Sequence, residues 1–165
     1  MRIARFAGII ESFVRPPARV LEIGAGEGLL AARLAQDGFD VVALDRTSRG
    51  TFSIVESSFE EYGAPAGAFD CIASQLVLHH VHDLDAALRK IATLLARGGI
   101  IAIDDYGWER SGDPAFRADR SDLHRADKML PALRRRFKEL YYDDHPYFDE
   151  GAGNDDLGFT FIGTV

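Results

Sequence analysis

The 165-residue sequence has little cysteine and no long apolar stretch. Cys71 is its single cysteine, so no disulfide can form within the chain, as is usual for proteins of a reducing compartment. No apolar run approaches the roughly 20 residues that cross a bilayer. Residues 1–14 alternate charged and apolar types, unlike a signal peptide. These absences predict a cytoplasmic protein without a membrane segment.

Positive charge is also scarce. Acidic residues outnumber basic residues 26 to 19, which gives a formal net charge of −7. Such a chain repels phosphate backbones, so duplex nucleic acid is not an expected partner. The densest basic cluster, Arg134 to Arg136 with Lys138, fits the solvated end of a helix. The length and the 47% content of hydrophobic residues predict a single folded domain, residues 1–165.

Hydrophobic patterning predicts an alternation of strands and helices, preceded by an N-terminal helix and linker over residues 1–18. Strands are expected at 19–23, 39–44, 52–55, 69–74, 100–103, 139–142 and 159–165, and helices at 3–13, 29–36, 83–96 and 121–137. Strands separated by helical segments favour the α/β class, with a doubly wound, mostly parallel sheet and right-handed crossovers.

Two connections depart from that regular alternation. Only residues 46–51 separate the second and third strands, too few for a crossover helix, so no full helix is expected between them. Residues 145–158 are rich in Gly, Asp and Asn and lack a helical pattern. A hairpin fits this segment best, so the last strand is predicted to run antiparallel to the others.

Glycines and an acidic residue follow the first two strands. The turn Gly24 to Gly28 comes directly after the first strand, and Asp45 ends the second. The carboxyl ends of parallel strands share one edge of the sheet, where ligands bind. Glycines let the backbone approach a ligand closely, and a carboxylate in this position accepts hydrogen bonds from ribose hydroxyls. The pattern predicts a ligand that contains adenosine.

Details of the turn distinguish between two adenosine ligands. Leu29 stands where the dinucleotide fingerprint has its third glycine. Glu22, inside the first strand, would repel a pyrophosphate but tolerates a cationic sulfonium. An NAD(P)-binding oxidoreductase is therefore the less favoured alternative, and no Tyr-x-x-x-Lys pair for hydride chemistry is present.

The segment VLEIGAGEG, residues 20–28, resembles the E/D-x-G-x-G-x-G signature of class I S-adenosylmethionine-dependent methyltransferases. Residues 42–45, 69–81 and 94–99 resemble, in order, the family's second strand, its fourth strand with the following loop, and its "L-x-P-G-G" turn. The resemblance covers residues 19–104. It implies a Rossmann-like fold and S-adenosylmethionine as cofactor.

The resemblance also implies which residues surround the methyl donor. They are Glu22 near its amino group; Gly24, Ala25, Gly26 and Gly28 along its methionine part; Asp45 at the ribose; Ser58 and Phe59 at the adenine; and Gln75 and Leu76 beside the transferred methyl. Ser58 departs from the family pattern, in which this position is usually acidic.

The sequence gives fewer indications of which residues bind the methyl acceptor or act in catalysis. His80, Asp105 and Tyr106 lie in or beside the loops after the fourth and fifth strands and are the candidate catalytic residues. Solvated loop positions are the alternative, and adjacent histidines point in different directions, so His79 or His80 is expected to be structural. No metal is expected, because nothing completes a tetrahedral set around the histidines. Four further residues in the tail are candidates to shape an acceptor pocket: His124, His145, Tyr147 and Phe148.

The function predicted from these features is methyl transfer to a small-molecule acceptor. An in-line displacement depends chiefly on orientation, so no indispensable catalytic residue is required. A non-catalytic S-adenosylmethionine-binding partner or regulatory module remains the alternative. The short N-terminal segment leaves little material for a lid, so a homodimer or a partner subunit is a candidate to complete the acceptor site.

Overall fold

A computed structural model describes residues 2–111, 113–146 and 157–165 of the chain. The helices are α1 (Arg2–Phe13), α2 (Leu29–Gln36), α3 (Leu84–Leu94), α4 (Pro114–Ala118) and α5 (Ala126–Arg136). The strands are β1 (Arg19–Ile23), β2 (Asp40–Asp45), β3 (Ile54–Glu56), β4 (Phe69–Gln75), β5 (Leu95–Tyr106), β6 (Lys138–His145) and β7 (Gly158–Thr164). Two short 3-10 turns, η1 (Leu78–His80) and η2 (Trp108–Arg110), follow β4 and β5. No helix within these ranges has the length and apolar character needed to cross a membrane.

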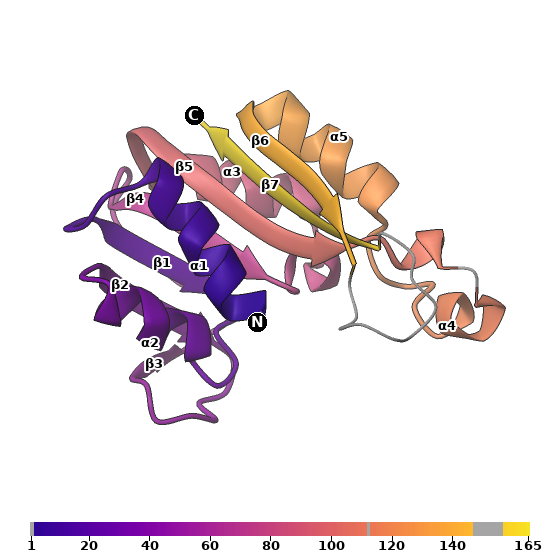
Figure 1. Ribbon diagram of the computed structural model, residues 1–165, viewed down its shortest axis with the longest axis horizontal. Helices are drawn as coiled ribbons and strands as arrows, with labels where there is room; N and C mark the ends of the chain where they lie inside the picture. Colours follow the sequence, from indigo (N-terminus) through magenta and orange to yellow (C-terminus); the bar gives the residue numbers. More distant parts are fainter. Residues whose placement is uncertain (1, 112, 147–156) are drawn as a thin grey trace.

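The strands of the described ranges form one sheet in the order β3-β2-β1-β4-β5-β7-β6. The pairs from β3 to β5 are parallel, whereas β7 runs antiparallel to both β5 and β6. In Figure 1, α1 and α2 lie in front of this sheet and α3 and α5 lie behind it. The predicted α/β, doubly wound sheet with an antiparallel last strand is confirmed.

Both faces of the central strands are buried, as a sheet covered by helices on two sides requires. Val20 and Cys71 pack with α1 and α2, while their neighbours Leu21 and Ile72 pack with α3 and α5. Burial raises the pKa of the Cys71 thiol to about 12. Cys71 is therefore an inert core residue, as its apolar surroundings in the sequence indicate.

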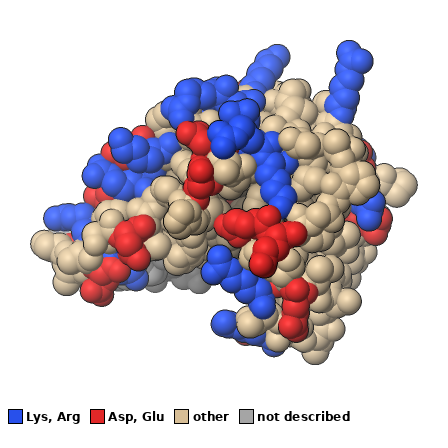
Figure 2. Space-filling view, turned by 180° about the vertical axis from the view of Figure 1, so that it is seen from behind, with Lys and Arg blue, Asp and Glu red and all other residues tan. Residues whose placement is uncertain are grey.

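The rear face carries most of the basic cluster. Figure 2 shows Lys and Arg side chains along the upper part of this face, interspersed with acidic ones. Arg134, Arg135 and Arg136 form the last turn of α5. A guanidinium nitrogen of Arg134 lies 2.7 Å from a carboxylate oxygen of Glu139, and one of Arg135 lies 3.7 Å from Asp85. The cluster is thus the charged end of a helix, as predicted.

The turn between α3 and β5 differs from the sequence prediction. The helix expected to reach residue 96 ends at Leu94, and β5 begins at once, so Gly98 and Gly99 lie inside a strand. Gly98 adopts φ +75°, and a Cβ on Gly99 would lie 2.9 Å from the carbonyl oxygen of Ala96. The glycines make a tight bend at the start of β5 rather than a helix stop.

The segment between β5 and β6 also differs. The helix expected at 121–137 spans only Ala126–Arg136, with Pro131 inside it, and α4 was not predicted. Asp113 caps α4 by accepting a hydrogen bond from the Ala115 backbone N–H at 2.9 Å, and Pro114 follows the cap. An Asp-Pro pair is a recognised signal for a helix start, but the helix is too short to show a periodic pattern.

The connection between β2 and β3 contains no helix, as predicted, although β3 begins two residues later than expected. Residues 46–53 fold back onto the glycine turn. A Cβ on Gly50 would lie 1.9 Å from the carbonyl oxygen of Glu27, and one on Gly28 would lie 2.7 Å from the Cβ of Phe52. The two segments can pack this closely only because both positions are glycine.

Replacing Gly50 should therefore disturb this contact. Gly50→Ala is expected to lower the free energy of unfolding by about 1–3 kcal/mol, because the new methyl group overlaps backbone that cannot move aside freely. Gly63→Ala is the matched control, since a Cβ there meets nothing within 4 Å. Urea denaturation measures both variants. Equal free energies of unfolding for the two variants would show that residues 46–53 do not pack on the glycine turn.

Candidate functional site

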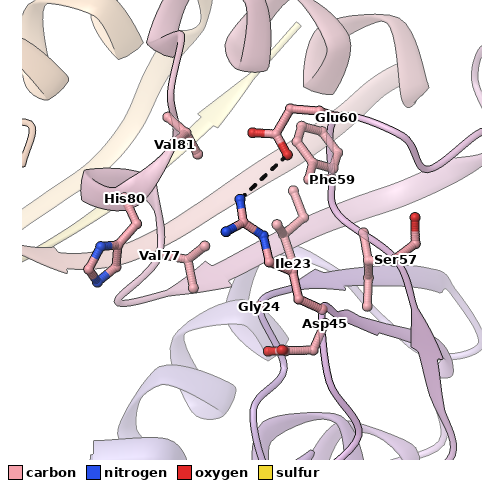
Figure 3. Close-up of a pocket in the computed structure, with 11 residues that line it drawn as sticks. Ile23, Gly24, Asp45, Ser57, Phe59, Glu60, Val77, His80 and Val81 are labelled. Carbon is pink, nitrogen blue, oxygen red and sulfur yellow. Dashed lines mark ion pairs between the residues drawn. The ribbon is translucent and has the colours of Figure 1, made fainter.

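A cavity of about 230 Å³ opens beyond the carboxyl ends of the central strands. It is lined by Ile23, Gly24, Leu44, Asp45, Arg46, Ser57, Phe59, Glu60, Val77, His80 and Val81, most of them drawn and labelled in Figure 3. The predicted site residues among them are Gly24, Asp45, Phe59 and His80. The others were missed, although several directly adjoin predicted positions in the sequence.

The glycine turn forms one end of the cavity. Gly24, Gly26 and Gly28 have φ values of 73°, 57° and 74°, in the left-handed region that favours glycine. A Cβ on Gly24 would lie only 2.2 Å from the Cγ2 of Val77, so glycine is also required there by close packing. The N–H groups of Gly24 and Ala25 both donate to the Leu44 carbonyl, at 2.8 and 2.9 Å. The turn is thereby fixed to the end of β2.

The Asp45 carboxylate strengthens that attachment. Its Oδ2 accepts a hydrogen bond from the Gly26 N–H at 2.8 Å, and its Oδ1 accepts one from the Thr47 N–H at 3.1 Å. A carboxylate oxygen has two lone pairs, so each can accept one more hydrogen bond. The carboxylate is held at the cavity by its neighbours and keeps the capacity to accept from two hydroxyl groups.

Glu22 lies behind the turn rather than in the cavity lining. It is buried, with 3% of its surface exposed, and its Oε2 has no hydrogen-bond partner among the described residues. Burial raises the pKa of Glu22 to about 8, a backbone hydrogen bond from Ala31 acts in the opposite direction, and the Asp45 charge raises it further. The carboxyl group is therefore largely protonated at neutral pH.

Of the two residues predicted to contact the adenine, Ser58 and Phe59, only one lies at the cavity. Phe59 lines the cavity and is almost fully buried, whereas Ser58 does not line it. The Ser58 hydroxyl donates to a Glu61 carboxylate oxygen at 2.8 Å and accepts from the Glu61 N–H at 3.2 Å. Ser57 is the serine at the cavity, one residue away from the predicted position.

The predicted residues at the end of β4 lie outside the cavity lining but support it. Gln75 donates from Nε2 to Asp104 Oδ2 at 2.7 Å, and the Leu76 N–H donates to the Asp104 carbonyl at 2.8 Å. Leu76 has φ 58°, unusual for a residue with a branched side chain. The turn at Leu76 places the next residue, Val77, in the cavity.

The Asp104 side chain makes hydrogen bonds and an ion pair with several side chains beneath α1. It is fully buried, and its carboxylate contacts Arg2 at 3.1 Å and His145 Nε2 at 2.9 Å. Burial by itself would raise the pKa of Asp104, but the hydrogen bond from His145, the charge of Arg2 and the hydrogen bond from Gln75 outweigh it and hold the pKa below its usual value. His145 thus belongs to this buried network and not to the cavity lining.

The two adjacent histidines have different surroundings. His79 is buried, with Nδ1 2.6 Å from Asp105 Oδ1 and its ring 4.7 Å from that of Tyr106. His80 lines the cavity. Burial, followed by the neighbouring His79, lowers the pKa of His80, so its imidazole is neutral at pH 7. Asp105 and Tyr106 contact His79 and do not line the cavity.

The loop that carries His80 is also held from the other side. The His124 N–H donates to the carbonyl of His79 at 2.9 Å, and His124 Nε2 lies 2.9 Å from the carbonyl oxygen of Val81. Tyr147 and Phe148, the other tail candidates, lie outside the described residues. Within the described ranges, no group of three or more His, Cys, Asp or Glu side chains has the arrangement of a metal site.

Comparison with known proteins agrees with this geometry. Residues 2–151 match the family model described as "Methyltransferase domain". Methyltransferase str2 of Strobilurus tenacellus is 34% identical over 118 residues, which is 64% of this chain and 42% of that protein. The ubiquinone biosynthesis O-methyltransferase of Caulobacter sp. is 31% identical over 99 residues, 52% of this chain and 39% of that protein.

A solved structure gives the same fold. The 1,6-didemethyltoxoflavin-N1-methyltransferase of Burkholderia thailandensis, with bound S-adenosylhomocysteine, superposes with a TM-score of 0.76 at 21% identity and covers 98% of this chain and 77% of its own. The chain belongs to the methyltransferase domain family, with its Rossmann-like fold. It spans less than half the length of the two sequence relatives.

The buried Glu22 predicts a pH-dependent stability. Below about pH 4.5 its carboxyl group is protonated in both folded and unfolded chains. Between pH 4.5 and about 8 only the unfolded chain ionises it, so this group lowers the free energy of unfolding progressively as pH rises. Glu22→Gln removes the titration. Urea denaturation across this range should show the variant gaining stability relative to the wild type, and a constant difference would contradict the assignment.

Proposed function

We propose that the chain binds S-adenosylmethionine in this cavity and transfers its methyl group to a small-molecule acceptor. The observation that carries the proposal is the Asp45 carboxylate, fixed by Gly26 and Thr47 at the edge of a cavity with apolar walls. A carboxylate in this position can accept hydrogen bonds from the two hydroxyl groups of a ribose.

The residues present fit the cofactor. Asp45 would hold the ribose, Phe59 and Ser57 would border the adenine, and the turn from Gly24 to Gly28 would hold the methionine part. Glu22, buried behind the turn, has an unpartnered oxygen that can accept a hydrogen bond from the cofactor's ammonium group, and the positive charge of that group would favour ionisation of the carboxyl group. When bound, S-adenosylmethionine supplies an electrophilic methyl group on a sulfonium.

His80 is the proposed proton acceptor. Its neutral imidazole lines the cavity and can take the proton of an acceptor hydroxyl or amine. Asp105 and Tyr106, which contact His79, are proposed to keep the turn η1 in place so that His80 stays at the cavity. Relatives named as O- and N-methyltransferases support a small-molecule acceptor. A homodimer or a partner subunit remains the proposed means of completing the acceptor site.

A donor-binding module without activity is the second candidate. It is favoured by the fact that only His80, of the three predicted catalytic residues, lines the cavity. Incubation with S-adenosylmethionine carrying a labelled methyl group, together with a panel of small phenols, carboxylates and amines, separates the two candidates. Label that appears in an acceptor establishes catalysis, whereas tight binding with no transfer to any compound favours the module.

Donor binding is tested by calorimetry. S-adenosylmethionine and S-adenosylhomocysteine are expected to bind, and NADH is expected to bind much more weakly. Asp45→Ala should weaken binding of both sulfur compounds by about 1–3 kcal/mol, because a charged hydrogen-bond acceptor is lost from the ribose. Tight NADH binding, with no heat from either sulfur compound, would overturn the proposal.

The role of His80 is tested with the acceptor that the labelling screen identifies. His80→Ala should lower turnover by roughly 10²-fold or more while the affinity for S-adenosylhomocysteine stays nearly constant, because the proton acceptor acts in the transition state. His82→Ala is the matched control, an exposed histidine of the same loop that does not line the cavity. Equal activity of the two variants would remove His80 from the mechanism.

A further inference from the structure

Lys90, on helix α3, contacts the part of the cavity wall that Phe59 and Glu60 form. Its ammonium nitrogen donates hydrogen bonds to the carbonyl oxygens of Phe59, at 2.6 Å, and Glu60, at 2.9 Å. The same nitrogen lies 5.1 Å from the centre of the Phe59 ring, within the range of a cation–π contact. Phe59 and Glu60, both labelled in Figure 3, line the cavity, whereas Lys90 does not. Lys90 therefore acts on this wall from outside the cavity.

The chain segment that carries this wall has little regular structure of its own. Residues 57–68, which join β3 to β4, contain no helix or strand. Backbone hydrogen bonds attach Ser57 to the end of β2 and Gly67 to α3. Between these two points, Lys90 is the only donor within the described ranges to the two carbonyls that it contacts. Its ammonium group thus joins the middle of the segment to a helix of the core.

A charged donor makes this connection a strong one. Hydrogen bonds from an ammonium group are shorter and stronger than those between neutral groups, and the Lys90 side chain is only half-exposed to competing water. Phe59 is buried, with 7% of its surface exposed. Without the ammonium group, the two carbonyls would lose their protein partner, and the backbone at residues 59–60 would be free to sample other conformations.

We propose that Lys90 is a positioning residue of the cofactor site, which holds the backbone of Phe59 and Glu60 so that this wall of the cavity is in place before a nucleoside binds. The inference rests on the proposed function and adds to it a residue outside the cavity. A wall that is already ordered strengthens binding, because the ligand does not have to order it.

Two measurements separate positioning from a contribution to stability alone. Hydrogen–deuterium exchange of the ligand-free protein reports the order of the segment through the Tyr62 N–H, which donates to the Ser58 carbonyl at 3.0 Å. Calorimetry reports the affinity for S-adenosylhomocysteine. Lys90→Met keeps an unbranched side chain but removes the donors, so it is expected to speed this exchange and to weaken binding, each roughly tenfold. Lys90→Arg should keep both values within about threefold of the wild type, because a guanidinium group can also donate to two carbonyls.

Arg89→Met is the matched control. Arg89 precedes Lys90 on α3, is exposed and does not line the cavity. The variant loses a positive charge from the same helix and gains the same methionine side chain. It should exchange the Tyr62 N–H and bind S-adenosylhomocysteine as the wild type does.

Each contrary outcome has a distinct meaning. Wild-type affinity in Lys90→Met would overturn the inference alone, provided that the wild-type protein binds S-adenosylhomocysteine. Weaker binding with unchanged exchange would also overturn it, because Lys90 would then act on the ligand and not through the backbone. Equal losses in Lys90→Met and Lys90→Arg would show that donation to the carbonyls is not the cause. If the wild type does not bind S-adenosylhomocysteine, the proposed function fails and the inference fails with it.

Discussion

The hydrogen bond from the Gly26 N–H to the Asp45 carboxylate is the contact on which the site depends. It joins the turn after β1 to the end of β2, and the Leu44 carbonyl reinforces it by accepting from Gly24 and Ala25. The parallel register of β1 and β2 brings these ends together. Because the glycine turn and the carboxylate fix each other, a ligand at this edge meets groups that are already in place.

The other side of the cavity is fixed by two consecutive aspartates on β5. Successive side chains of a strand point to opposite faces, so Asp104 lies beneath α1 while Asp105 reaches His79. Asp104 holds the end of β4 through Gln75, and Asp105 holds the η1 turn. The segment that follows Gln75 carries the cavity residues Val77, His80 and Val81. These contacts fix the segment as one wall of the cavity.

Local patterns predicted the features that depend on neighbouring residues. The glycine turn, Asp45 and the sheet class follow from strand and turn signals of short range, and the structure confirms their positions. The site roles of these residues stay predictions. Ser58 was placed at the adenine by its resemblance to the family's acidic-then-apolar pair, whereas its hydroxyl bonds to Glu61 and Ser57 lines the cavity.

Features that depend on distant residues were not predictable. Gln75 turns toward Asp104, a partner on another strand, and His79 is distinguished from His80 by its contacts with Asp105 and Tyr106. Arg46 and Val77 are common residue types without a signature, so only the folded chain places them at the cavity. Gly98 and Gly99 looked like a helix stop because nothing local shows that β5 begins before them.

The most direct test of the central claim is a crystal structure of the protein with S-adenosylhomocysteine. The account predicts both ribose hydroxyls within about 2.5–3.0 Å of the Asp45 carboxylate oxygens, with the purine beside Phe59 and the thioether near the glycine turn. A nucleoside bound elsewhere, or one that leaves Asp45 in contact only with Gly26 and Thr47, would contradict it.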